Sequence, residues 1–220
     1  MIVYTDPQGS LEWLAARRGV ITGSRFKDCR DYNQPTAAEK KAGETRGKPS
    51  KTLLAYAMDV ARERVGGIAP SKFVTHAMRA GTEEEPPARI AYEAETGHLV
   101  EEAGFITTDD RLFGCSVDGF VGADGVIEIK TMVSSDTLFR AVVQGDISEY
   151  IDQINGEMWL LGRKWVDLVL WAPDLEPLGK HLTIRRVVRD EAAIQALEDD
   201  LMTFARLVAQ FEKELRKEAA

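Results

Sequence analysis

The sequence has few of the residues that build disulfide scaffolds and zinc sites. Two of its 220 residues are cysteine, Cys29 and Cys115, and three are histidine. Two distant cysteines fit a reducing compartment better than a disulfide framework, and the histidines have none of the spacings of a zinc site. The sequence also lacks an apolar run long enough for a membrane span and the basic and apolar segments of a secretory signal. We therefore expect a cytoplasmic protein that does not contact a membrane.

Glycine-rich phosphate loops are missing as well. Neither the Walker A pattern nor the dinucleotide-binding pattern is present, so an ATP-driven helicase has no support. The sequence contains no internal repeat and no long low-complexity run. With 44% hydrophobic and 29% charged residues, the composition is that of a globular protein with a proper core. The length suits a single domain over residues 1–220.

The net charge is negative, but the basic residues are concentrated at one end. The formal net charge is -8. Residues 1–80 carry 14 Lys and Arg against 8 Asp and Glu, whereas residues 81–220 carry 14 against 28. This asymmetry is typical of a protein with one side facing a polyanion; a solvated basic loop is the alternative.

The order of the predicted elements indicates an α/β fold. Helical patterns dominate the first hundred residues, apart from a basic, exposed loop near 31–50 that we expect to be mobile. Three strands, two helices, two strands and a long helix from about residue 190 follow. This order predicts a central mixed sheet flanked by helices. In the helical pattern at 75–97, Pro86 and Pro87 predict a break or a kink.

The stretch CSVDGFVGADGVIEIK places three charged side chains in a predicted hairpin over residues 115–130. The turn GADG joins its two strands. Because side chains alternate along a strand, Glu128 and Lys130 share one face, and the turn brings Asp118 opposite Glu128. The sequence therefore predicts that these three side chains converge at one point on the sheet.

The charged residues of the hairpin form a set suited to metal-assisted hydrolysis of a phosphodiester. Two close carboxylates repel each other unless a cation lies between them. Mg²⁺ prefers hard oxygen ligands, and a bound divalent cation lowers the pKa of its water and steadies charge on a phosphoryl oxygen. A nearby lysine can orient or deprotonate the attacking water, or offset developing charge. A surface salt bridge across the hairpin is the alternative interpretation.

Four blocks of sequence, in this order and spacing, carry a resemblance to a known family. They are WLAARRGVITGS at 13–24, AGTEEE at 80–85, CSVDG with GVIEIK within 115–130, and EYIDQINGEMW at 149–159. Over nearly its full length the chain resembles the lambda exonuclease family, the YqaJ-type viral recombinases of the PD-(D/E)XK nuclease superfamily. The resemblance implies a restriction-endonuclease-like α/β core.

The resemblance also implies a role for each matching residue of the site. Asp118 and Glu128 look like the metal-binding carboxylates, with the carbonyl group of Ile129 as a further ligand. Lys130 looks like the lysine that activates the water. Gln153 matches a glutamine of the following helix that helps to hold the site.

A second acidic position and a DNA-end pocket follow from the same resemblance. Glu85 matches an additional acidic residue for a second metal, although the prolines that follow leave the choice among Glu83, Glu84 and Glu85 open. Arginine can hold a phosphate with two donors at once; a helix salt bridge and an N-cap are the alternatives for Arg17 and Ser24. The residues implied to bind DNA are Arg17, Ser24 and Ser116, around the 5′-phosphate, and Trp13 and Met78, near the point where the strands part.

The activity implied by the family is the 5′-to-3′ degradation of one strand of linear double-stranded DNA to mononucleotides. It would depend on Mg²⁺, or on Mn²⁺ in its place, with one or two ions per site. The resulting 3′ overhangs would serve a single-strand annealing partner. The family further implies a homotrimer ring, encoded by a phage or prophage and acting in the bacterial cytoplasm. A structure-specific endonuclease on the same fold and a catalytically idle DNA-end-binding module are the two alternatives.

Overall fold

The computed structural model describes residues 1–68 and 76–217, and of residues 76–80 the backbone alone. The strands are β1 (Ile2–Tyr4), β2 (Ile21–Thr22), β3 (Phe105–Thr107), β4 (Phe113–Ser116), β5 (Gly119–Val121), β6 (Gly125–Thr131), β7 (Trp165–Trp171) and β8 (Leu182–Val188). The α-helices are α1 (Leu11–Arg17), α2 (Phe26–Cys29), α3 (Ala37–Lys41), α4 (Lys51–Arg64), α5 (His76–Thr96), α6 (Ser135–Leu138), α7 (Ile151–Leu161) and α8 (Glu191–Leu215). The remaining helical segments are two 3₁₀ turns, Gly23–Arg25 and Pro173–Leu178, and a π-helix, Phe139–Val143.

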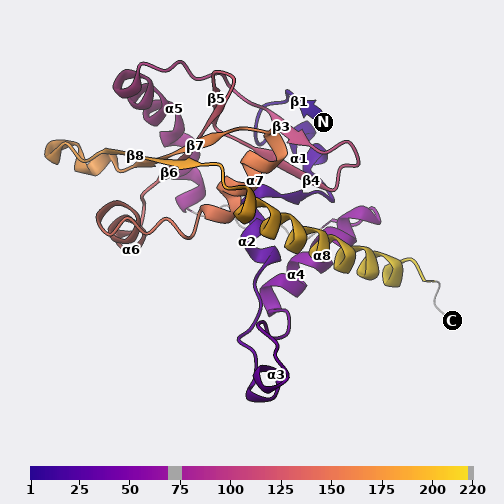
Figure 1. Cartoon of the computed structure of the whole chain (residues 1–220). Helices are drawn as coiled ribbons and strands as arrows, with labels where there is room; N and C mark the ends of the chain where they lie inside the picture. Colours follow the sequence, from indigo (N-terminus) through magenta and orange to yellow (C-terminus); the bar gives the residue numbers. More distant parts are fainter. Residues whose placement is uncertain (69–75, 218–220) are drawn as a thin grey trace.

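The strands form two four-stranded sheets with helices around them (Figure 1). Their orders are β1-β3-β4-β2 and β5-β6-β7-β8, and each sheet has both parallel and antiparallel neighbours. The predicted α/β class with mixed strands and flanking helices is therefore confirmed. The sequence predicted one continuous strand through Val117 and Asp118. In the structure the chain leaves the first sheet and enters the second at these two residues.

The hairpin formed by β5 and β6 has the register expected from the sequence. Gly119 pairs with Ile127 and Val121 pairs with Gly125, so the next position along each strand places Asp118 level with Glu128. The turn can be this tight because glycine accepts the backbone angle of +55° at position 122 without strain.

The central strand β6 is covered on both faces. Ile127 and Ile129 pack in a hydrophobic cluster with Tyr92 of α5. Val126 points to the other side and belongs to the main core, which contains Ile154 of α7 and much of α8. The charged residues that alternate with the two isoleucines therefore point toward α7, where water is largely excluded.

Helix α7 lies close to the rest of the core because it carries a glycine at the contact. A Cβ atom on Gly156 would lie 2.2 Å from the ring of Phe26, a residue of α2. No side chain larger than hydrogen fits there unless the helix moves. This contact sets the depth at which the polar residues of α7 face β6.

Helix α5 continues through its two prolines, so the predicted break does not occur. Pro86 and Pro87 are exposed, whereas Ala88 and Tyr92 are buried against the sheet. The lost backbone donors therefore fall on the solvent side, where water can hydrate the freed carbonyl groups. The helix keeps its register, and Glu85 stays on the side that faces the hairpin.

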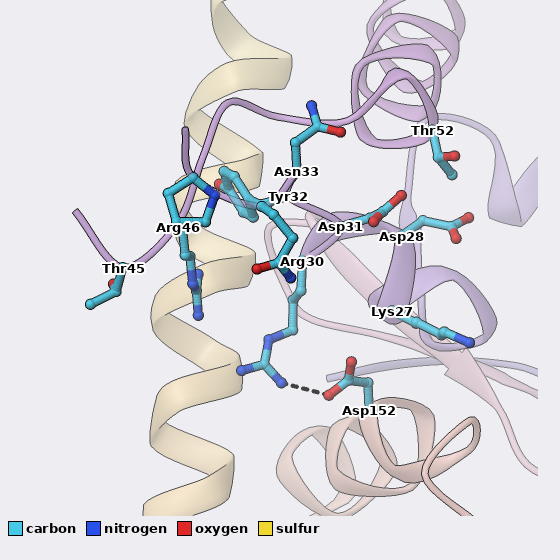
Figure 2. A pocket seen from close by; sticks show the side chains of 12 residues that line it. Lys27, Asp28, Arg30, Asp31, Tyr32, Asn33, Thr45, Arg46, Thr52 and Asp152 are labelled. Atoms are coloured by element: carbon cyan, nitrogen blue, oxygen red, sulfur yellow. Dashed lines mark hydrogen bonds and ion pairs between the residues drawn. The ribbon is translucent and has the colours of Figure 1, made fainter. Parts of the chain in front are cut away.

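The segment 31–50 extends away from the sheets and carries the short helix α3 (Figure 1). Arg46 anchors it to α8 through an ion pair with Asp200, which also binds Arg30. A hollow of about 590 Å³ lies beside this segment. Arg30, one of the residues that line it, extends toward Asp152 of α7 (Figure 2). Ion pairs inside the protein thus neutralise part of the basic charge of this region.

None of the helices within the described residues is long and apolar enough to cross a membrane.

Candidate active site

A cavity of about 350 Å³ lies where β6, α1, α5 and α7 approach one another. It brings together most of the site residues predicted from the sequence. The residues that line it are Gln8, Trp13, Arg17, Gly23, Ser24, Gly81, Thr82, Glu85, Ser116, Asp118, Glu128, Ile129, Lys130 and Gln153. It is smaller than the hollow of Figure 2, but it alone of the two contains the charged residues of the hairpin.

Asp118 lies at the point where the chain crosses between the sheets, and its carboxylate is fixed to the neighbouring strand. Its Oδ2 accepts a hydrogen bond of 2.6 Å from the backbone amide of Ile129. The side chain is thus held beside the backbone of β6 and directed into the cavity that Glu128 also lines.

The side-chain amide of Gln153 is the centre of a hydrogen-bond network. Its Nε2 donates to Oε1 of Glu128 at 2.5 Å and to Oε1 of Glu157 at 2.8 Å. Its Oε1 accepts from Nζ of Lys130 at 3.2 Å. Nζ of Lys130 also forms an ion pair with Oε1 of Glu128 at 2.7 Å. One amide therefore joins the charged residues of β6 to helix α7.

Acidic groups outnumber basic groups in this buried network. Burial, and then the charges of Glu128 and Glu85, raise the pKa of Asp118 well above its usual range. Burial and the charge of Glu128 also raise the pKa of Glu157. Burial by itself would lower the pKa of Lys130, but the charges of Glu128 and Asp118 outweigh it and raise that pKa. The single lysine is therefore held as an ammonium among several acids.

Glu157 is a residue whose importance the sequence did not reveal. Nothing in the sequence around it indicates burial, yet it is 0% exposed. It lies one helical turn after Gln153, so both side chains point the same way. The (i, i+4) spacing was the only available signal, because its burial depends on how deeply α7 packs.

The residues of the cavity fit a divalent cation. Asp118 and Glu128 provide hard oxygen donors, and Oε2 of Glu128 is buried without a hydrogen-bond partner among the described residues. In the described part of the chain no group of three or more His, Cys, Asp and Glu side chains is placed to hold a metal. The candidate donors are therefore two carboxylates and the backbone carbonyl of Ile129, with water for the remaining positions. A cation there would favour the charged forms of these carboxylates.

The three consecutive glutamates of α5 point in different directions. Glu85 lines the cavity and forms an ion pair of 2.7 Å with Arg89. Glu84 accepts a hydrogen bond of 2.8 Å from Nε1 of Trp171. Glu83 is exposed. The geometry thus favours Glu85, which the sequence left open among the three.

Arg17 lies in the same cavity with its guanidinium against aromatic rings. It is centred 4.2 Å from the ring of Trp13 and 5.0 Å from that of Phe105, and it donates a long hydrogen bond of 3.5 Å to Oγ of Ser116. Burial lowers its pKa. Within the described residues Arg17 forms no ion pair, so the helix salt bridge considered from the sequence is not formed.

Ser24 is exposed at the rim of the cavity and lies inside the 3₁₀ turn Gly23–Arg25. The alternative that it caps a helix is therefore wrong, since its hydroxyl caps neither this turn nor α2. Met78 belongs to the first turns of α5, and its side chain lies outside the described residues.

A mixed α/β fold in which Asp118 lies level with Glu128, and Lys130 follows on the same strand as Glu128, is the arrangement of a restriction-endonuclease-like nuclease. The comparison with protein families gives the narrower assignment. The chain belongs to the family of the YqaJ-like viral recombinase domain, whose model matches residues 12–164.

Solved structures agree with this assignment. An alkaline exonuclease from Laribacter hongkongensis is 33% identical, with a TM-score of 0.75, and the match covers 94% of this chain and 97% of that chain. The same values hold for its complex with dAMP. A phage-related exonuclease from Haemophilus somnus 129PT, 17% identical with a TM-score of 0.66 over 89% of this chain and 96% of that chain, shares the fold. No curated protein sequence matches. The protein is accordingly a deoxyribonuclease that acts as an exonuclease.

Replacing Glu85 by glutamine is expected to lower the rate of DNA degradation by about 10–100-fold, because it removes a charge beside the carboxylates of Asp118 and Glu128. Glutamine can still bond to Arg89, so the helix should remain intact. Glu83→Gln is the matched control and should keep the wild-type rate. Release of acid-soluble nucleotides from duplex DNA measures both variants; equal rates for the two would contradict the assignment of Glu85.

Proposed function

We propose that the protein is a Mg²⁺-dependent 5′-to-3′ exonuclease that degrades one strand of linear double-stranded DNA to mononucleotides. The observation that carries this proposal is the shared cavity. Asp118, Glu128 and Lys130 lie in the same cavity as Arg17 and Ser116. Groups suited to cutting a phosphodiester are therefore next to groups suited to holding a terminal phosphate.

The metal would be held by Asp118, Glu128 and the carbonyl group of Ile129, with Glu85 near a second position. When bound, it supplies a water of lowered pKa and offsets charge on the phosphoryl oxygen. Lys130 holds its proton at Nζ and donates toward the attacking water and the developing negative charge. Gln153 keeps Lys130 and Glu128 in place through its amide.

The DNA end would be fixed by its 5′-phosphate. The guanidinium of Arg17 is pre-oriented by Trp13 and Phe105, and the hydroxyl groups of Ser24 and Ser116 are close by. A terminal phosphate held here would set the distance from the end to the scissile bond, so each cut would release one nucleotide. The similarity to an alkaline exonuclease solved with dAMP is consistent with a mononucleotide product.

Replacing Lys130 by alanine is expected to reduce cleavage by about 10²–10³-fold, the usual effect of removing one electrostatic donor from an active site. Wild-type protein should digest linear duplex DNA with Mg²⁺ or Mn²⁺ and not with EDTA. It should leave covalently closed circles intact, because these have no ends. Full activity of Lys130→Ala would contradict the mechanism, and cleavage of closed circles would favour an endonuclease.

The end pocket predicts a strong preference for 5′-phosphorylated over 5′-hydroxyl duplex ends. Wild-type protein should degrade the phosphorylated substrate at least about tenfold faster, since an arginine–phosphate contact has two charge-assisted hydrogen bonds. In Arg17→Lys this ratio should fall, because lysine lacks the planar fork. Equal rates on both ends in the wild type would contradict the pocket and the polarity together.

The family assignment also leads us to propose a homotrimer ring that acts with a single-strand annealing protein in the cytoplasm of a bacterial host of the phage or prophage. A ring would keep the enzyme on its DNA, and the annealing protein would receive the 3′ overhang. Multi-angle light scattering should give three times the mass of one chain. A monomeric mass at working concentration would contradict the ring.

A further inference from the structure

Helix α7 contains a carboxylate that the catalytic scheme does not use. Glu157 is 0% exposed, and its hydrogen bond to the amide of Gln153, at 2.8 Å, involves Oε1 alone. Oε2 has no partner within the described residues. The thiol of Cys115 lies within electrostatic reach, and its pKa is raised by burial first and then by the charge of Glu157.

Stability does not account for a glutamate at this position. A buried acid whose second oxygen is unpartnered destabilises a folded protein, and an apolar residue of similar volume usually improves stability. The neighbours along the helix, Ile154 and Met158, are fully buried apolar residues, so a leucine at 157 would continue their surface. The acid must therefore be explained by what it does to its one partner.

That partner is the side-chain amide of Gln153, and its orientation decides which of its atoms face the neighbouring charged groups. Both N–H groups of Gln153 point at carboxylates, one on Glu128 and one on Glu157, while its carbonyl oxygen faces Lys130. A flipped amide would turn its oxygen toward two carboxylates and its donors toward an ammonium. Without Glu157, one N–H would lose its acceptor, and only Glu128 and Lys130 would still oppose the flip.

We propose that Glu157 is a positioning residue of the nuclease site, which fixes the side-chain amide of Gln153 and through it the placement of Lys130 and Glu128. This inference rests on the proposed function, in which those two residues take part in cleavage. Glu157 is not among the residues that line the cavity of the site. Its contribution is to the geometry of the groups that do.

The test compares Glu157→Leu with Glu157→Gln. Leucine removes the acceptor, so kcat on duplex DNA in Mg²⁺ should fall by about 10–100-fold, the usual loss when a supporting partner of an active-site residue is removed. KM should remain unchanged, because the DNA-end pocket is intact. Glutamine can still accept from Gln153 and should restore most of kcat. The melting temperature of Glu157→Leu without metal should equal or exceed that of the wild type.

Two further variants separate positioning from packing. Met158→Leu changes a buried neighbour outside the network and should keep wild-type kcat. Gln153→Leu should lose as much as Glu157→Leu, and the double variant should lose no more than Gln153→Leu alone, because both act through one amide.

Two results would overturn the inference. One is wild-type kcat in Glu157→Leu. The other is a loss of kcat in Glu157→Leu that comes with a lower melting temperature and adds to the loss in Gln153→Leu. Failure of the proposed function would look different. The wild-type protein itself would then show no metal-dependent cleavage. In that case Glu157 would have no catalytic groups to position, and the inference would be wrong as well.

Discussion

Like charges in a buried space are the constraint on which the rest of the site depends. Asp118, Glu128 and Glu157 share the neighbourhood of one lysine. Such a group is stable only with cations and donors in the right places. Lys130 and the amide of Gln153 provide part of this compensation, and a divalent cation would provide the rest. Three features hold these acidic side chains together. They are the hydrogen bonds of Gln153, the backbone amide of Ile129 and the close packing of α7 against the core.

The fold delivers these groups from the connection between β4 and β5, from β6 and from α7. The chain crosses from one sheet to the other between Ser116, the last residue of β4, and Gly119, the first residue of β5, and the two sides of this crossing serve different parts of the site. Ser116, at the end of β4, is near Arg17, and Asp118, within the connection, is fixed to β6. End recognition and cleavage are therefore coupled through a short stretch of backbone. Gly156 allows α7 to complete the arrangement from the opposite side.

The parts of the site that follow from local rules could be predicted from the sequence. Strand alternation and the turn GADG were enough to place Asp118 level with Glu128, and glutamates at consecutive positions on a helix must point in different directions. Burial set by tertiary packing could not be predicted. The burial of Glu157 depends on how closely α7 approaches β6, which no local pattern shows. The continuity of α5 depends on which side of the helix its prolines face. The division into two sheets rests on short strands, β1 and β2, whose pairing partners are far away in the sequence.

The most direct test of this account is the position of a divalent cation in crystals of the protein grown with Mn²⁺ and located by anomalous diffraction. The account predicts a peak bonded to the carboxylates of Asp118 and Glu128 and to the carbonyl oxygen of Ile129, with the amide of Gln153 still bridging Glu128 and Glu157. A cation bound elsewhere, with Asp118 and Glu128 free of metal, would contradict it.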